Sequence, residues 1–85
     1  MQLELFTADI CSRCIRARGV MTAVVEELGD DQVELAFLDV VENLDHAVET
    51  GVLVTPALAA NGKLMFSPLP DRDRILQALR EELMR

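Results

Sequence analysis

The chain of 85 residues is long enough for one domain and too short for two, because a core in this size range buries only about 60 % of the unfolded surface. Its 15 acidic and 8 basic residues give a net charge of −7, which disfavours nucleic acid and anionic lipid surfaces as partners. No apolar stretch approaches the roughly 20 residues that span a bilayer, and residues 1–6 lack the basic flank of a signal peptide. We therefore expect one domain over residues 1–85 that works in the cytoplasm, away from membranes.

The first half of the chain predicts a strand, a long helix and a second strand. Residues 2–6 alternate as a strand does, and a loop leads on to Cys11. One buried helix face is then indicated by residues at spacings of three and four, namely Cys14, Ala17, Met21, Val24 and Leu28. Gly29 follows as the expected left-handed stop. Residues 33–40 form a near-continuous apolar run, which predicts a strand covered on both faces and joined to the first by a right-handed crossover.

The second half predicts a short helix, a hairpin and a final helix. The short helix should end at Gly51. Two apolar runs, residues 55–60 and 63–66, flank Asn61-Gly62, which is the preferred two-residue turn of an antiparallel hairpin. Asp71 can cap the last helix. The apolar stripe of that helix consists of Ile75, Leu76, Leu79 and Leu83. The predicted order is β-α-β-α-β-β-α.

The chemistry of this sequence centres on two cysteines in the stretch Cys11-Ser12-Arg13-Cys14, where the first strand leads into the first helix. Residues three apart share a helix face with Cβ atoms about 5–6 Å apart, so a disulfide can form and open with modest local adjustment. Cys11 would lie in the first helical turn, where unpaired N–H groups favour a thiolate, and we assign it as the nucleophile. Cys14 lies one turn deeper on the apolar stripe and is assigned as the resolving thiol.

Two charged residues beside the cysteines are candidates for supporting roles. Arg13 lies between the two thiols, where its positive charge would further favour the Cys11 thiolate, and we assign it a tuning role. Asp9 precedes the motif by two residues and is expected to cap the helix, the alternative being that it shuttles a proton to Cys14.

Other interpretations of the cysteine pair stay open. Both thiols could be ordinary core residues, or they could be half of a metal site. A structural zinc needs four protein ligands and a catalytic zinc needs three, whereas the chain adds only His46, which is expected on a solvated helix surface. Soft Cu(I) would suit two thiolates better than zinc, so the metal alternative is a thiolate metal carrier. A Cys-x-x-Cys motif near a βαβ pattern favours redox chemistry.

The order of elements, the position of the motif and Thr55-Pro56 together resemble the thioredoxin superfamily over nearly the whole chain. Residues 5–7 are similar to the glutaredoxin entry into its active site, and residues 54–63 resemble the thioredoxin segment around its cis-proline. The resemblance implies an α/β, thioredoxin-like fold with a four-stranded mixed sheet flanked by helices. It also implies that Pro56 is a cis-proline facing the dithiol and that the backbone of Thr55 pairs with a substrate chain. From its own sequence context, Pro56 indicates only a strand entry.

The resemblance further implies a thiol-disulfide oxidoreductase, a protein disulfide oxidoreductase of the thioredoxin and glutaredoxin type. Its partners would be protein disulfide substrates and an upstream dithiol reductase, and we expect a monomer that needs no cofactor and no metal. Glutaredoxins hold glutathione in the region that corresponds to residues 67–71, where Pro68 and Pro70 lack N–H donors. We therefore expect a protein dithiol to reduce this protein better than glutathione does.

A binding module without redox chemistry is the alternative from another class, since a fold does not fix a function. Residues 55–58 and 69–76 also resemble the circadian clock protein KaiB, which is thioredoxin-like and binds partners. The intact pair of Cys11 and Cys14 favours the enzyme, because a pure binding module has no need of it.

Overall fold

The structure is a computed structural model that describes all 85 residues. Its elements are β1 (Gln2–Thr7), α1 (Ser12–Leu28), β2 (Glu34–Asp39), α2 (Leu44–Thr50), β3 (Ala57–Ala60), β4 (Lys63–Phe66) and α3 (Arg72–Leu83). This order is the one predicted from the sequence. None of the helices has the length and apolar character that crossing a membrane requires.

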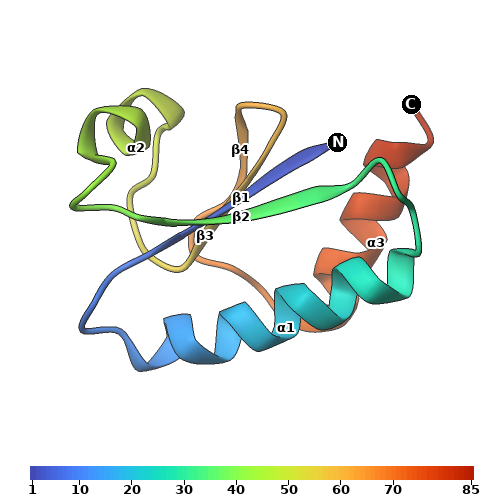
Figure 1. The fold of residues 1–85 in the computed structure, drawn as a ribbon, viewed down its shortest axis with the longest axis horizontal. Coiled ribbons are helices and arrows are strands. Elements are labelled where there is room, and N and C mark those ends of the chain that lie inside the picture. The colour runs from blue at the N-terminus through green and yellow to red at the C-terminus, as the bar shows by residue number, and fades with distance from the viewer.

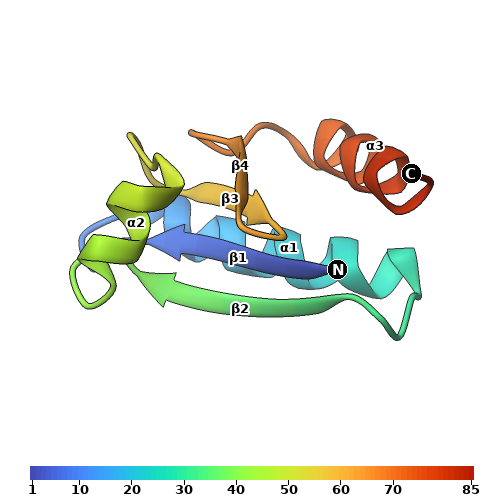
Figure 2. The same cartoon turned by 90° about the horizontal axis from the view of Figure 1, so that it is seen from above.

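The four strands form one mixed sheet in the order β2-β1-β3-β4 (Figure 2). β1 pairs in parallel with β2, while β3 pairs antiparallel with both β1 and β4. The tight turn between β3 and β4 is confirmed as Asn61-Gly62, with φ of 51° and 81°, because both positions need the left-handed region that Asn and Gly tolerate. The predicted fold class is thus confirmed, with helices packed on both faces of the sheet.

The two faces of the sheet carry different amounts of core. α1 and α3 lie together on one face and α2 lies on the other (Figure 1). The first face holds the main core, made of Leu3, Leu5, Ala17, Met21, Val24, Val33, Leu58, Ala60, Ile75 and Leu79. The second face holds a small cluster made of Phe6, Ala47, Ala57 and Ala59. The stripe predicted for α1 therefore does face the sheet, and it fixes the helix against β1 and β3.

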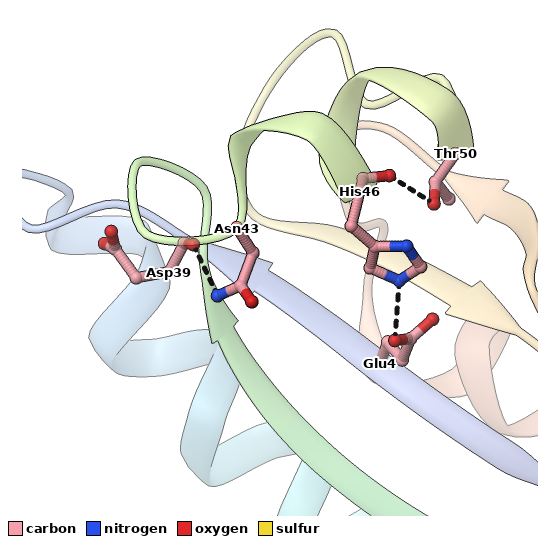
Figure 3. A network of polar contacts seen from close by, with 5 residues as sticks. All are labelled: Glu4, Asp39, Asn43, His46 and Thr50. Carbon is pink, nitrogen blue, oxygen red and sulfur yellow. Dashed lines mark hydrogen bonds and ion pairs between the residues drawn. The ribbon is translucent and has the colours of Figure 1, made fainter.

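The short helix α2 is also held by polar contacts, drawn in Figure 3. His46 Nε2 lies 2.8 Å from Glu4 Oε2 on β1, and the imidazole lies 5.6 Å from the Phe6 ring, centroid to centroid. Asn43 Nδ2 donates to the carbonyl of Asp39 at 3.0 Å. His46 is exposed on the surface of α2, as expected, but solvation is not its whole environment, because its ring also meets a carboxylate 42 residues earlier in the chain.

The expectation that residues 33–40 form a strand covered on both faces is wrong in its second part. The strand is present as β2, but it is an edge strand of the sheet, and Ala36 and Phe37 are exposed. β1 and β3 take the two central positions instead. A continuous apolar run therefore identified the strand but not its place in the sheet.

The predicted helix ends are in place. Gly29 and Gly51 end α1 and α2 with φ of 60° and 93°, as expected of left-handed C-caps. Asp71 caps α3, since its Oδ1 accepts the backbone N–H of Arg74 at 3.0 Å. These stops fix where each connection begins, including the segment from Ser67 to Asp71 that runs past the start of α1.

Candidate active site

Cys11 and Cys14 are joined by a disulfide at the start of α1, so the structure shows the oxidised form of the pair. Their Cα atoms lie 5.2 Å apart, within the ordinary range for a disulfide. Cys11 is itself the N-cap of α1, and its Sγ accepts the backbone N–H of Cys14 at 3.2 Å. No acidic side chain lies in the first turn. Such a helix end stabilises negative charge on the Cys11 sulfur once the disulfide opens.

The cap expected from Asp9 is therefore wrong, because α1 begins at Ser12, directly after Cys11. The side chain of Asp9 is exposed and lies beside the cysteines in a cavity of about 320 Å³. Phe37 and Asp39 from β2 also line this cavity. The structure thus brings Asp9 close to the disulfide, but on the side of the exposed sheet edge.

The two sulfurs differ in access to solvent. Cys14 is 3 % exposed, whereas Cys11 is part-exposed and stands between Ile10 and Ile15, which are 99 % and 77 % exposed. Cys11 is therefore the more accessible of the two cysteines, and an exposed apolar side chain lies on either side of the motif in the chain. Cys14 stays behind Cys11, on the buried face of α1.

The Thr55-Pro56 peptide bond is cis, as the resemblance implied. Pro56 is buried directly before β3, and it lines a cavity of about 290 Å³ together with Arg13 and Ala17 from α1. Arg13 is exposed and has no ion-pair partner. The structure therefore brings Arg13 and Pro56 into the lining of one cavity, whereas Cys11 and Cys14 line the neighbouring cavity that also holds Asp9.

A residue that the sequence analysis missed, Ser67, holds the segment before Pro56 in place. Its hydroxyl oxygen accepts the N–H groups of Leu53 at 3.2 Å and Val54 at 2.9 Å, and it donates to the carbonyl of Val54 at 2.8 Å. These three bonds fill the capacity of a hydroxyl. The only signal in the sequence is a single small polar residue between an apolar strand and a proline.

Thr55 differs from its neighbours because its backbone is free. Neither its N–H nor its carbonyl makes a hydrogen bond, whereas Val54 is bound to Ser67 and the carbonyl of Pro56 accepts the N–H of Leu69 at 2.8 Å. Thr55 is half-buried. A backbone that is held in place on both sides and unpaired in the middle can accept an extended chain.

The site offers little to a metal ion. No group of three or more His, Cys, Asp or Glu side chains lies close enough together to hold one. His46, the third ligand considered from the sequence, is paired with Glu4 on the α2 face of the sheet.

Comparison with known proteins gives a consistent result. Residues 1–80 match the thioredoxin domain family. A thioredoxin of Methanocaldococcus jannaschii is 31 % identical over 83 residues, which cover 98 % of this chain and 96 % of that protein. A probable thioredoxin of Methanothermobacter thermautotrophicus is 29 % identical with the same coverage. In both cases the similarity runs over nearly the whole length of both chains.

Solved structures share the fold. Thioredoxin 1 of Thermosipho africanus superposes with a TM-score of 0.79 at 17 % identity, covering 99 % of this chain and 96 % of that one. A mutant thioredoxin of Halobacterium salinarum superposes with a TM-score of 0.67 at 29 % identity, covering 94 % of this chain and 72 % of that one. The chain belongs to the thioredoxin family. With its disulfide at the start of α1, it is a thiol-disulfide oxidoreductase that acts as a protein disulfide oxidoreductase.

Proposed function

We propose that Cys11 is the nucleophile and Cys14 the resolving thiol in disulfide exchange with other proteins. The observation that carries this proposal is the asymmetry of the pair: Cys11 caps the helix and is part-exposed, whereas Cys14 is 3 % exposed. The helix end lowers the energy of the Cys11 thiolate, and burial keeps Cys14 from competing for the substrate.

Each turnover is a balanced two-electron exchange. The Cys11 thiolate attacks one sulfur of the substrate disulfide, the substrate S–S bond breaks, and the second substrate sulfur leaves as a thiolate that takes up a proton. Cys14, after losing its proton, attacks Cys11 Sγ in the mixed disulfide. This step forms the Cys11–Cys14 bond seen in the structure and releases the first substrate sulfur as a thiol. The substrate gains two electrons and two protons, which an upstream dithiol reductase returns to the protein.

The substrate chain docks along Thr55 and Pro56 in this proposal. The unpaired N–H and carbonyl of Thr55 can each take one hydrogen bond from an extended segment, as in strand addition. Pro56 and Arg13 line the adjoining cavity, and the charge of Arg13 favours the thiolate of Cys11. We further propose that residues 1–85 act as one domain and as a monomer in the cytoplasm, without a cofactor. The net charge of −7 supports the proposal that nucleic acid and anionic membrane surfaces are not partners.

A redox titration tests the proposed chemistry. The protein is equilibrated at a series of poised potentials, its free thiols are alkylated, and the added mass is measured. We expect one reversible two-electron transition in which Cys11 and Cys14 are alkylated together. A pair that stays fully reduced or fully oxidised across the whole accessible range would contradict a redox role and favour the binding module.

The reductant is tested by side-by-side kinetics. We expect the oxidised protein to be reduced faster by a thioredoxin-reductase-type system or another protein dithiol than by glutathione, because Pro68 and Pro70 offer no N–H to a tripeptide. Fast, saturable reduction by glutathione alone would move the protein to the glutaredoxin class.

A further inference from the structure

The cavity beside Pro56 combines apolar walls with several charges. It has a volume of about 290 Å³ and is lined by Ala17, Pro56 and Leu69, together with Arg13, Arg16 and Arg72. Pockets that enclose whole small molecules span roughly 300–1,000 Å³, so this one suits one or two side chains of a larger partner.

Two of its three arginines are unpaired. Arg13 and Arg16 are exposed on α1 and make neither an ion pair nor a hydrogen bond, whereas Arg72 lies 2.6 Å from Glu27. The one acidic residue that lines the cavity, Asp71, uses a carboxylate oxygen to cap α3. The cavity therefore presents two free guanidinium groups toward solvent beside the docking segment.

This charge stands out against the rest of the molecule. The protein carries a net charge of −7, and the cavity on the other side of the disulfide is lined by Asp9, Asp39 and Glu42, with Arg18 as its only cation. An acidic segment is repelled by most of the surface and attracted at Arg13 and Arg16. Charge arranged in this way orients a partner of complementary charge and slows the approach of partners without it.

We infer that the protein prefers protein disulfides in which an acidic residue lies close to the attacked cysteine, with its carboxylate between Arg13 and Arg16. This inference rests on the proposed function and deepens it by naming the substrate class. The occupant is a segment of a protein chain, because the free backbone of Thr55 beside Pro56 accepts an extended chain that continues past the cavity.

The helix geometry gives the position of the acidic residue. Arg16 follows Cys11 by five residues, which is about 7.5 Å along a helix at about 1.5 Å per residue. An extended chain advances about 3.3 Å per residue, so the carboxylate belongs about two residues from the cysteine that Cys11 attacks.

The test uses disulfide-bonded peptides that are identical except for Glu, Gln or Lys at two residues from the cysteine. The rate at which the protein reduces each peptide is measured at low and high ionic strength. Dithiothreitol is present to return the oxidised protein to its dithiol form. Arg16→Gln is the test variant and leaves the cysteine motif unchanged. Arg74→Gln is the matched control, since it removes the same charge from a residue that is exposed on α3 and makes no ion pair.

We expect the Glu peptide to be reduced with a kcat/KM roughly five- to tenfold above that of the Lys peptide at low salt, mainly through KM, as two exposed charge pairs allow. High salt should reduce this ratio of kcat/KM between the Glu and Lys peptides. The ratio should fall below about threefold in Arg16→Gln and stay unchanged in Arg74→Gln.

Four results would count against the inference or the proposed function, and they differ in what they overturn. Equal kcat/KM for Glu and Lys peptides, or equal loss of preference in Arg16→Gln and Arg74→Gln, would overturn the acidic-substrate inference alone. A third result is that the protein reduces glutathione disulfide in preference to the Glu peptide and loses this preference in Arg16→Gln. That result would overturn the choice of a protein segment as the occupant of the cavity. Failure to reduce any peptide would overturn the proposed function itself.

Discussion

The two sides of the disulfide are built differently. On the Pro56 side, Ser67 and Leu69 hold the backbone with hydrogen bonds of 2.8–3.2 Å. On the Phe37 side, an edge strand leaves Phe37 exposed, and the guanidinium of Arg18 lies 4.6 Å from the centroid of its ring. In the proposed function the substrate docks at the held backbone around the free Thr55, and not at the edge strand with its cation–π contact. Substrate recognition should therefore depend on the Pro56 side.

The largest effect should come from the cysteines that separate the two sides. In the reduced protein, we expect free Cys11 in the Cys14→Ser variant to react with an alkylating agent about tenfold or more faster at neutral pH than free Cys14 in Cys11→Ser. The reason is the helix cap at Cys11 and the 3 % exposure of Cys14. Alkylation rates measured against pH check this, and a faster Cys14 below neutral pH would reverse the assigned roles.

A smaller effect on stability and on KM should follow from removing a hydrogen bond that holds the backbone before Pro56. Ser67→Ala removes the hydroxyl that binds Leu53 and Val54, which should cost about 0.5–1.5 kcal/mol in the free energy of unfolding, because water can reach the freed N–H groups, and raise KM for a protein disulfide several-fold. Chemical denaturation and steady-state kinetics measure the two effects. Thr22→Ala is the control, because this exposed hydroxyl on α1 donates only to the carbonyl of Arg18. An equal rise in KM in both variants would remove Ser67 as a positioning residue.

The smallest effect should come from the Phe37 side. Phe37→Ala removes the ring beneath Arg18, a contact worth about 0.5–1 kcal/mol at an exposed site, and should change kcat/KM less than twofold. The same denaturation and kinetic measurements apply. A loss of kcat/KM as large as that of Ser67→Ala would mean that substrates dock on both sides of the disulfide.

Much of the fold could be predicted from the sequence because its signals are local. Helix periodicity, the glycines after α1 and α2 and the Asn61-Gly62 turn depend on residues close together in the chain, and each element they predicted is present. The cysteine motif could also be recognised from the sequence, because the spacing of Cys11 and Cys14 on one helix face is itself local.

The errors concern contacts between distant segments. Which strand lies at the edge depends on how the whole sheet assembles, so the exposure of Phe37 could not be predicted from an apolar run. His46 meets Glu4 across 42 residues, and Ser67 reaches Val54 across 13. The cap at Cys11 rather than Asp9 reflects a different limit, because helix starts are uncertain by one or two residues from sequence.

The central claim, attack by Cys11 with resolution by Cys14, is tested most directly by trapping the mixed disulfide. The Cys14→Ser variant is mixed with a protein disulfide substrate and quenched with acid, and the adduct is mapped by mass spectrometry. We expect a stable adduct joined through Cys11 Sγ, because the resolving thiol is gone, and no adduct with Cys11→Ser. An adduct that forms through Cys14 in the Cys11→Ser variant, with none in Cys14→Ser, would contradict the claim.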